Sequence, residues 1–478
     1  MPTHNIKTRR VFVFSILILH SVLLGTTTAK NQHNIVLFLI DDLGWSDLSC
    51  QGSTYYQTPN IDLLAAQGAR FTDAYAACAV CTPTRAAIMT GKYPARTLMT
   101  EWLPSGRWDP KARLREGRFL RDLPREEYTI AEALRDAGYR TGHFGKWHLG
   151  TETFGMPEHH GFQVNVGGNP HGNPGNYFFP YNGSWKIPKT NQRANWNVLQ
   201  NGEPGEYLTD RLTKEAVNFI QQYKVDGKPF FLYFPHYGVH TPIQAKKEAV
   251  AKYEKVEEHK RQGLPAYAAM IESIDDSVGQ ILQTLEKLDL TDNTLVIFAS
   301  DNGGFWKATS NAPLRANKGA YYEGGIRVPL IIKWPNVVEQ GIVINTPSTS
   351  ADLYPTCLTA AGLPLLPNQH QDGLDLTPLL DGKGAIEERA LFWHYPHYNG
   401  HPSSVPSSVI RKGKWKLIQT YDPAGIEVYN LESDLSETNN LAMRETELTD
   451  RLLNELEAWK VSVGAEKMLP NPDFDEQQ

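Results

Sequence analysis

The chain has 478 residues, 41% of them hydrophobic, and a formal net charge of −6. This length accommodates one large domain and a small one with buried cores. An acidic balance argues against nucleic-acid binding, which relies on a basic surface, and four cysteines are too few for a disulfide framework in a chain this long.

The first 29 residues have the pattern of a secretory signal peptide. Lys7, Arg9 and Arg10 precede an apolar run over residues 11–24, and Ala29 ends a candidate cleavage site. The run is short for a membrane span, and no later segment looks transmembrane. We therefore expect a secreted or periplasmic protein with no membrane attachment after signal cleavage. Cleavage would remove three positive and no negative charges, which changes the net charge from −6 to −9.

Apolar runs that alternate with helical patterns predict an α/β fold. Strands are predicted at 34–40, 139–144, 228–234, 294–300 and 328–332, and helices at 58–68, 81–91, 129–138 and 267–288. Apolar runs with few polar positions are typical of strands buried on both faces. The alternation predicts a mostly parallel central sheet flanked by helices.

Two regions depart from this alternation. Residues 151–205 are rich in Gly, Asn, Pro and aromatic residues, and we expect a long irregular segment there. After Gly373, short strand-like pieces and a helix from about Glu445 to Trp459 predict a small C-terminal antiparallel sheet with one helix. We thus expect a signal peptide (1–29), a catalytic domain (30–375) and a smaller C-terminal α+β subdomain (376–478).

Acidic and amide side chains follow two of the predicted central strands. Asp41 and Asp42 come directly after the strand at 34–40, and Asp301 and Asn302 come after the strand at 294–300. Ligands of parallel sheets bind beyond the carboxyl ends of the strands. A set of oxygen ligands suits a hard cation such as Ca²⁺ and argues against zinc. Helix capping is the alternative role for any one of these residues.

Cys81 is predicted to stand at the start of a helix. Pro83 fits the first turn, where its missing N–H costs nothing, and Gly91 can end the helix. Free N–H groups at such a terminus favour anions, and Arg85 lies one turn further on. This combination suits a tetrahedral oxyanion such as sulfate or phosphate. The alternatives are a buried cysteine at a helix N-terminus with no chemical role and a redox pair with Cys78.

Cys81-Thr-Pro-Thr-Arg85, followed by Thr90-Gly91, resembles the signature of the type I sulfatases in the alkaline phosphatase superfamily. Further segments resemble that family in its order: Asp41-Asp42-Leu43-Gly44, Gly145-Lys146-Trp147-His148, His240-Thr241-Pro242, Asp301-Asn302-Gly303-Gly304 and the loop around Lys318. They cover most of residues 34–332, and residues 427–441 resemble a motif of the family's C-terminal domain. Thr84 stands where serine is common, and Leu435 where proline is common.

The resemblance implies an alkaline phosphatase-like fold and a sulfuric ester hydrolase. It implies that a formylglycine-generating enzyme oxidises Cys81 to formylglycine (3-oxoalanine), whose hydrated form attacks sulfur. One Ca²⁺ per chain is implied, with five ligands: Asp41, Asp42, the modified Cys81, Asp301 and Asn302. The implied catalytic residues are Cys81, Arg85, Lys146, His148, His240 and Lys318. Among them the two lysines hold the sulfate, and His240, preferred over His236, is the general acid.

The substrate is expected to be a sulfated polysaccharide or its oligosaccharides. Candidate substrate residues in or near loops are His171, Trp306, Arg315 and His397, together with Trp102. Aromatic, His and Arg side chains suit stacking on a sulfated sugar and hydrogen bonding to it, although each could equally serve packing. A phosphate or phosphonate ester hydrolase of the same superfamily and a catalytically silent sulfated-glycan binding protein remain the alternatives.

Overall fold

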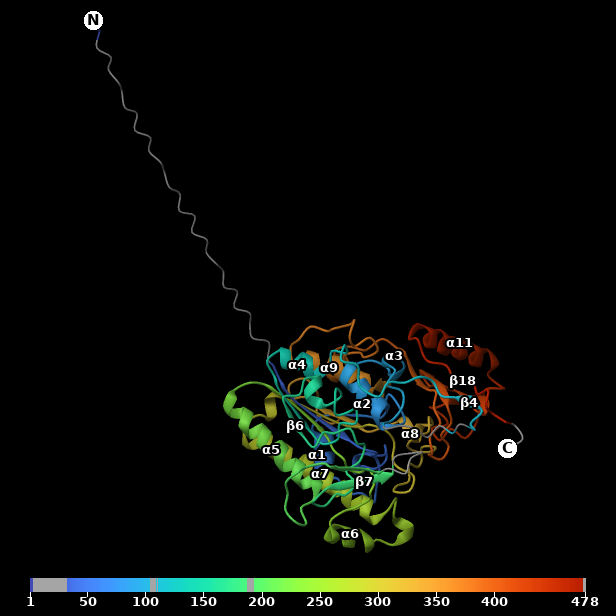
Figure 1. Cartoon of the computed structure of the whole chain (residues 1–478), viewed down its shortest axis with the longest axis horizontal. Coiled ribbons are helices and arrows are strands. Elements are labelled where there is room, and N and C mark those ends of the chain that lie inside the picture. Colours follow the sequence, from blue (N-terminus) through green and yellow to red (C-terminus); the bar gives the residue numbers. More distant parts are fainter. Residues whose placement is uncertain (3–31, 104–108, 110, 187–192, 476–478) are drawn as a thin grey trace. The chain divides into compact units, whose positions relative to one another are not determined.

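The computed structural model describes residues 1–2, 32–103, 109, 111–186 and 193–475 (Figure 1). Gln32–Gln478 form one compact unit. Apart from residues 1 and 2, the predicted signal peptide lies outside the described residues. Within the described ranges, no helix combines the length and the apolar character that crossing a bilayer requires.

An eight-stranded mixed sheet forms the centre of this unit. Its strands lie in the order β12 (Ile342–Ile344), β2 (Ala69–Phe71), β11 (Leu330–Lys333), β10 (Thr294–Ser300), β1 (Asn34–Ile40), β9 (Phe230–Pro235), β5 (Arg140–Phe144) and β6 (Val164–Val166). Only β11 runs antiparallel to its neighbours, so the prediction of a mostly parallel sheet is confirmed.

Strand β1 is central because both of its faces are apolar and fully buried. Val36, Phe38 and Ile40 pack into one core cluster, and the alternating residues Ile35 and Leu37 pack into another. The helices accordingly lie in two layers (Figure 1). One layer contains α1 (Pro59–Ala66), α5 (Leu208–Asp226) and α7 (Pro265–Lys287), and the other contains α2 (Cys81–Thr90), α4 (Ile130–Asp136) and α9 (Leu353–Ala360).

Several short elements connect these layers. The short helices are α3 (Pro94–Thr97), α6 (Lys247–Glu254), α8 (Glu323–Ile326) and α10 (Thr377–Leu380). Short strands pair as β3 (Ala74–Tyr75) with β13 (Ser348–Thr349), and as β4 (Leu114–Arg115) with β18 (Leu469–Pro470). A capping box formed by Thr129 and Glu132 begins α4, within the range predicted to be helical.

The predicted C-terminal antiparallel sheet is confirmed. It contains β14 (Ala390–Tyr395), β15 (Ser407–Lys412), β16 (Trp415–Tyr421) and β17 (Ala424–Asn430), and α11 (Thr446–Ser462) packs against it. Buried Lys416 of β16 pairs with Glu323 at 2.9 Å and with Glu437 at 2.8 Å. Because Glu323 belongs to α8, this ion pair ties the small sheet to the part of the chain that follows Lys318.

Residues 151–205 are more regular than the sequence predicted. β6 extends the central sheet, and β7 (Asn182–Lys186) pairs with β8 (Arg193–Asn197) as a hairpin. β6 alternates but has only three residues, and β7 and β8 lack a clear alternation of apolar and polar residues, which is why the pattern did not predict these strands. Trp196 of β8 donates a hydrogen bond from Nε1 to the Asn173 carbonyl at 3.1 Å, so the hairpin supports the 171–173 loop.

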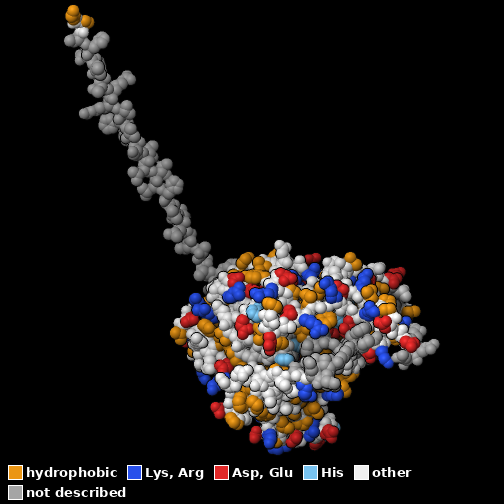
Figure 2. Space-filling model, in the orientation of Figure 1, with side chains coloured by type: hydrophobic (Ala, Val, Ile, Leu, Met, Phe, Trp, Pro, Cys, Tyr) orange, Lys and Arg blue, Asp and Glu red, His pale blue; other side chains and the backbone are white. Residues whose placement is uncertain are grey.

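Charges of both signs are interspersed over the displayed face of the molecule (Figure 2). This face therefore carries no broad basic area of the kind that binds nucleic acids.

Candidate active site

The acidic residues gather at the carboxyl ends of β1 and β10. These two strands are parallel neighbours, and Ile40 is in register with Ser300, so Asp41 and Asp301 emerge side by side. The Asp42 N–H donates to Asp301 Oδ1 at 3.2 Å, and Asn302 Nδ2 donates to Asp42 Oδ1 at 2.8 Å. All four side chains are buried.

Cys81 is the first residue of α2 and is also buried. The preceding residue, Val80, is extended, and Gly91 ends the helix in the left-handed conformation with φ 68°, as its position predicted. The Cys81 Sγ atom lies 3.7 Å from Asp41 Oδ1 and 3.5 Å from Lys318 Nζ. Burial, the largest effect, raises the pKa of this thiol to about 12, so the unmodified cysteine is a poor nucleophile at neutral pH.

The arrangement fits a bound cation. Potential ligand atoms of Asp41, Asp42, Cys81 and His240 all lie within 4.8 Å of one another. Among the residues that the structure describes, buried Asn302 Oδ1 has no hydrogen-bond partner, so an acceptor oxygen is available beside the carboxylates. Carboxylate and amide oxygens are the donors that hard divalent cations prefer.

Each of the three carboxylates has a cationic partner. Lys146 Nζ lies 2.7 Å from Asp41 Oδ2, and Lys318 Nζ lies 2.6 Å from Asp42 Oδ1. Arg85 donates from Nε and Nη2 to Asp301 Oδ2 at 2.9 and 2.7 Å. Since Arg85 is fully buried, it orients Asp301 from behind the cavity.

The pKa values of the adjacent Asp41 and Asp42 are shifted in opposite directions. Burial raises the pKa of Asp41 to about 8 despite the positive charge of Lys146. For Asp42, burial also raises the pKa, but the positive charge of Lys318, and to a smaller extent that of Lys146, outweighs it and brings the pKa below its usual value. A crowded carboxylate set of this kind is favoured by an additional positive charge.

Two histidines border the cavity. His148 has a left-handed backbone with φ 63°, and its Nε2 atom contacts the Leu103 carbonyl. His240 is held by a 2.8 Å contact from Nδ1 to the Thr241 carbonyl, and its Nε2 lies 3.7 Å from Asp42 Oδ2. Burial, then the charge of Lys318, lowers the pKa of His240 well below its ordinary value. The rival, His236, is buried against Phe234 with ring centroids 3.9 Å apart and does not line the cavity.

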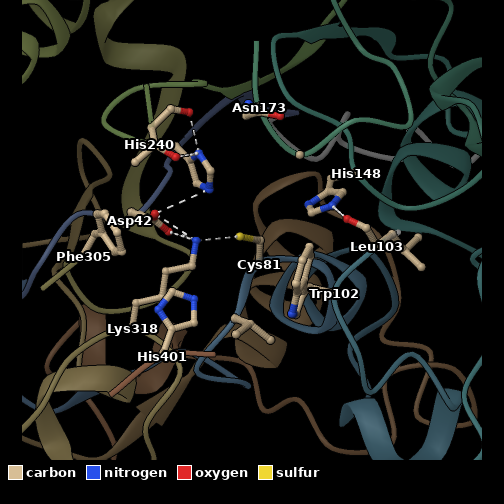
Figure 3. Close-up of a pocket in the computed structure, with 13 residues that line it drawn as sticks. Asp42, Cys81, Trp102, Leu103, His148, Asn173, His240, Phe305, Lys318 and His401 are labelled. Atoms are coloured by element: carbon tan, nitrogen blue, oxygen red, sulfur yellow. Dashed lines mark hydrogen bonds and ion pairs between the residues drawn. The ribbon is translucent and has the colours of Figure 1, made fainter. Parts of the chain in front are cut away.

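These groups open into a cavity of about 270 Å³. The lining residues are Asp42, Val80, Cys81, Trp102, Leu103, His148, Gly172, Asn173, His240, Thr241, Phe305, Lys318 and His401. Figure 3 shows Phe305 and Trp102 on opposite sides of the Lys318–Cys81 contact, with His240 and His401 above and below it in the view. The cavity thus combines a cationic and nucleophile-bearing centre with aromatic walls.

The four predicted substrate residues lie outside this lining. His171 adjoins Gly172 and stacks on Trp196 with ring centroids 4.1 Å apart. Arg315 Nη1 donates to Tyr429 Oη at 2.9 Å and to the Glu437 carbonyl at 2.7 Å. Trp306 is 44% exposed and lines a separate neighbouring groove.

His397 is fully buried, contrary to the expectation that it lines the mouth of the site. Its Nε2 lies 2.8 Å from Thr100 Oγ1, and its ring packs against Tyr395 and Phe119. The strand-like pattern at 390–395 did not reveal that His397 packs against Thr100 and Phe119, which lie far from it in the sequence. In this position His397 offers no surface to a ligand in the cavity.

Trp102, a candidate from the sequence, does line the cavity. The sequence did not identify four other lining residues as parts of the site: Asn173, Thr241, Phe305 and His401. Phe305 directly follows Asp301-Asn302-Gly303-Gly304, and Thr241 adjoins His240, so adjacency was a usable signal for both. His401 belongs to a connection between β14 and β15, and no local pattern links that connection to Cys81.

Comparisons with known proteins agree with this geometry. The family model described as Sulfatase matches residues 33–363, and that of the N-sulphoglucosamine sulphohydrolase C-terminal region matches residues 316–462. A protein named "Sulfatase" from Formosa agariphila is 33% identical, with 97% of this chain and 96% of that protein covered. N-acetylgalactosamine-6-sulfatase of Mus musculus is 33% identical, with 79% and 72% covered. The crystal structure of Ps i-CgsB has a TM-score of 0.76 at 30% identity, with 93% and 94% covered.

Proposed function

Because the chain belongs to the formylglycine-dependent sulfatases of the alkaline phosphatase superfamily and is a sulfuric ester hydrolase, we propose that it removes sulfate from a sulfated polysaccharide or its oligosaccharides, with a formylglycine made from Cys81 as nucleophile. The observation that carries this proposal is the position of Cys81 at the base of a cavity, 3.5 Å from Lys318 Nζ and beside the carboxylates that follow β1.

The proposed nucleophile is the hydrated aldehyde, which carries two hydroxyl groups on one carbon. One hydroxyl loses its proton and its oxygen attacks sulfur, while the sugar oxygen leaves with a proton from a general acid. The second hydroxyl then loses its proton, the C–O bond to sulfate breaks, and the aldehyde is restored. Plain cysteine or serine lacks the second hydroxyl and could not complete this cycle.

Lys318 and Lys146 are proposed to hold the charge of the sulfate group. Lys318 lines the cavity, and Lys146 lies behind it on Asp41. Fixed positive charges beside a breaking S–O bond stabilise the negative charge that develops on the bridging oxygen. We assign the positioning of the nucleophile to Arg85, through Asp301, and to His148 at the cavity wall.

His240 is the proposed general acid. Burial and Lys318 keep it neutral in the free cavity. An anionic sulfate ester beside the ring would raise the pKa of His240 and favour the protonated form that the leaving oxygen needs. The 2.8 Å contact of Nδ1 with the Thr241 carbonyl fixes the ring so that Nε2 faces the cavity.

One calcium ion per chain is proposed as the cofactor. Asp41, Asp42, Asp301 and Asn302 would hold it together with the modified Cys81, which supplies an oxygen ligand once its sulfur is replaced. The unpartnered Asn302 Oδ1 supports this assignment. Bound Ca²⁺ would supply positive charge that neutralises the sulfate and lowers the pKa of the attacking hydroxyl.

A carbohydrate substrate is supported by the relatives and by the cavity walls. The mouse relative is named N-acetylgalactosamine-6-sulfatase. Ps i-CgsB, which is 30% identical to this chain, has also been solved in complex with k-i-k-neocarrahexaose. Trp102 and Phe305 offer flat apolar surfaces suited to sugar rings. A human relative is a steryl-sulfatase at 32% identity, so a steroid sulfate belongs in any substrate panel.

Export and maturation are proposed from the N-terminal pattern and from Cys81. Residues 1–29 would direct export to the periplasm or the medium, and a formylglycine-generating enzyme would convert Cys81. The catalytic domain is assigned to residues 30–375 and the C-terminal subdomain to residues 376–478.

The test is sulfate release from a panel containing chondroitin 6-sulfate and carrageenan oligosaccharides, a steroid sulfate and phosphate monoesters. The protein is co-expressed with a formylglycine-generating enzyme, and Cys81→Ala is measured in parallel. Sulfate released from a glycan by the parent alone is the expected result. Turnover of phosphate esters without sulfate release would overturn the proposal. Glycan binding without turnover by a protein with converted Cys81 would instead favour a silent binding protein.

A further inference from the structure

A second hollow adjoins the cavity that contains Cys81. It is a groove of about 530 Å³, which we call the Trp306 groove. Its lining residues are Gln262, Gly263, Leu264, Trp306, Lys307, Ala308, Thr309, Ser310, Asn311, Ala312, Leu314, Ala316 and Asn317. The two hollows are adjacent along the chain at two places: Phe305 and Lys318 line the cavity, and their sequence neighbours Trp306 and Asn317 line the groove.

The chemistry of the Trp306 groove suits an anionic carbohydrate. Trp306 is 44% exposed, an unusual state for so large an apolar side chain. Lys307 is exposed, and its Nζ lies 4.9 Å from the centre of the Trp306 ring. The described residues that line the groove include this lysine and no acidic residue. A flat aromatic surface beside a cation, in a groove whose described lining residues include no carboxylate, matches a sugar ring that carries a sulfate.

The groove is rigidly built and tied to the catalytic loops. Thr309 Oγ1 donates to Asp47 Oδ1 at 2.8 Å, and the Gly44 N–H donates to Asp47 Oδ2 at 2.9 Å. Asn311 pairs with both the N–H and the carbonyl of Gly304, at 3.0 and 3.1 Å. Gly44 and Gly304 each stand two residues after a proposed metal ligand, so the groove has a fixed position relative to the cavity. A preformed groove reduces the ordering that binding requires.

We infer that the Trp306 groove binds the sugar unit next to the one that loses its sulfate. Trp306 stacks on that neighbouring ring, and Lys307 pairs with its sulfate or carboxylate group. This inference rests on the proposed function and adds to it that the preferred substrate is an oligosaccharide or polymer with adjacent anionic units. The ring centroids of Phe305 and Trp306 are 6.2 Å apart. In this arrangement Phe305 contacts one sugar in the cavity, and Trp306 contacts the next sugar in the groove.

The test compares two matched substrate pairs on the matured enzyme. These are N-acetylgalactosamine 6-sulfate with a chondroitin 6-sulfate tetrasaccharide, and galactose 4-sulfate with a carrageenan hexasaccharide. The parent is expected to have a higher kcat/KM on the oligosaccharide of the pair that it hydrolyses. Trp306→Ala should lower that value roughly tenfold, as expected when one large apolar contact is lost, and leave monosaccharide hydrolysis unchanged. Trp306→Phe should retain most of the oligosaccharide activity.

Lys307→Met tests the charge separately. It should lower oligosaccharide kcat/KM by about threefold at low salt, and the difference should disappear at high salt because the pair is exposed. Lys287→Met is the matched control, since this exposed lysine lies at the far end of α7, on the order of 30 Å from Leu264.

Three outcomes would overturn the inference. The first is a parent enzyme with no preference for the oligosaccharide. The second is a Trp306→Ala variant in which both members of a pair lose activity equally. Either would leave the proposed function standing, because the monosaccharide is still hydrolysed by the parent. The third, no hydrolysis of any member of either pair, would count against the proposed function and the groove together.

Discussion

Replacing Asn302 by leucine tests whether the acidic cluster holds calcium. Leucine has a similar volume and removes the Oδ1 atom that has no partner in the structure. Calcium at 100 times its dissociation constant adds about 2.7 kcal/mol to the free energy of unfolding. For a chain of this size, that raises Tm by about 3 °C. We expect this calcium-dependent rise in the parent, measured by calorimetry in Ca²⁺ and in EGTA, and its loss in Asn302→Leu.

The matched control separates a lost ligand from general destabilisation. Asn302→Leu also removes hydrogen bonds to Asp42 and to the Gly303 carbonyl, so its Tm will fall even in EGTA. Asn311→Leu likewise removes two hydrogen bonds, both to Gly304, yet no proposed ligand. It should have a lower Tm and keep the calcium-dependent rise. A full rise in Asn302→Leu would refute the role of Asn302, and no rise in the parent would refute the metal site.

Three further predictions concern buried titratable side chains: Lys318, Lys416 and His236. Lys318→Met should lower kcat/KM for sulfate release by about 10²- to 10³-fold, since it removes a fixed charge beside the reacting sulfate, and near-normal kinetics would contradict that role. Lys416→Met should lower the free energy of unfolding by about 3–5 kcal/mol, because it removes the buried cation that Glu323 and Glu437 share, although Glu323 keeps its pair with Arg327. Lys412→Met, which breaks the exposed pair with Glu455, should cost at most about 1 kcal/mol. Equal Tm values for the two variants would argue against the buried network. Burial lowers the pKa of His236 to about 3, so below pH 6.5 the unfolded chain binds a proton there that the folded chain does not. The free energy of unfolding therefore decreases as the pH is lowered, by up to about 1.4 kcal/mol per pH unit. His236→Gln should reduce the dependence of Tm on pH between pH 6.5 and 5, and an unchanged dependence would show that His236 does not contribute.

The grouping of Asp41, Asp42, Asp301 and Asn302 could be predicted because it depends on local order along the chain. Asp41 follows β1 and Asp301 follows β10, and parallel strands with buried faces deliver their carboxyl ends to one edge of the sheet. Cys81 was predictable for the same reason, since Pro83 and Gly91 mark the two ends of its helix. The prediction of a mostly parallel sheet was therefore sufficient to predict that the residues after β1 and β10 lie close together.

The rim of the cavity could not be predicted in the same way. His401 reaches the cavity from the connection between β14 and β15, and its position depends on how the C-terminal sheet packs. His397, four residues earlier, is buried instead. Arg315 is held by Tyr429 of β17, which is also a contact between segments far apart in the sequence. Composition identified residue types suited to a sugar, but long-range packing decided which of them face the cavity.

The role of Cys81 as the source of the nucleophile is tested by following its conversion together with sulfatase activity. The measurement is sulfate release by the parent, by Cys81→Ser and by Cys81→Ala, each co-expressed with a formylglycine-generating enzyme, on the best glycan of the panel. Mass spectrometry of the peptide containing residue 81 accompanies each assay. We expect formylglycine and repeated turnover in the parent, and neither in the two variants. Repeated turnover by Cys81→Ala, or by a parent in which Cys81 remains a thiol, would contradict it.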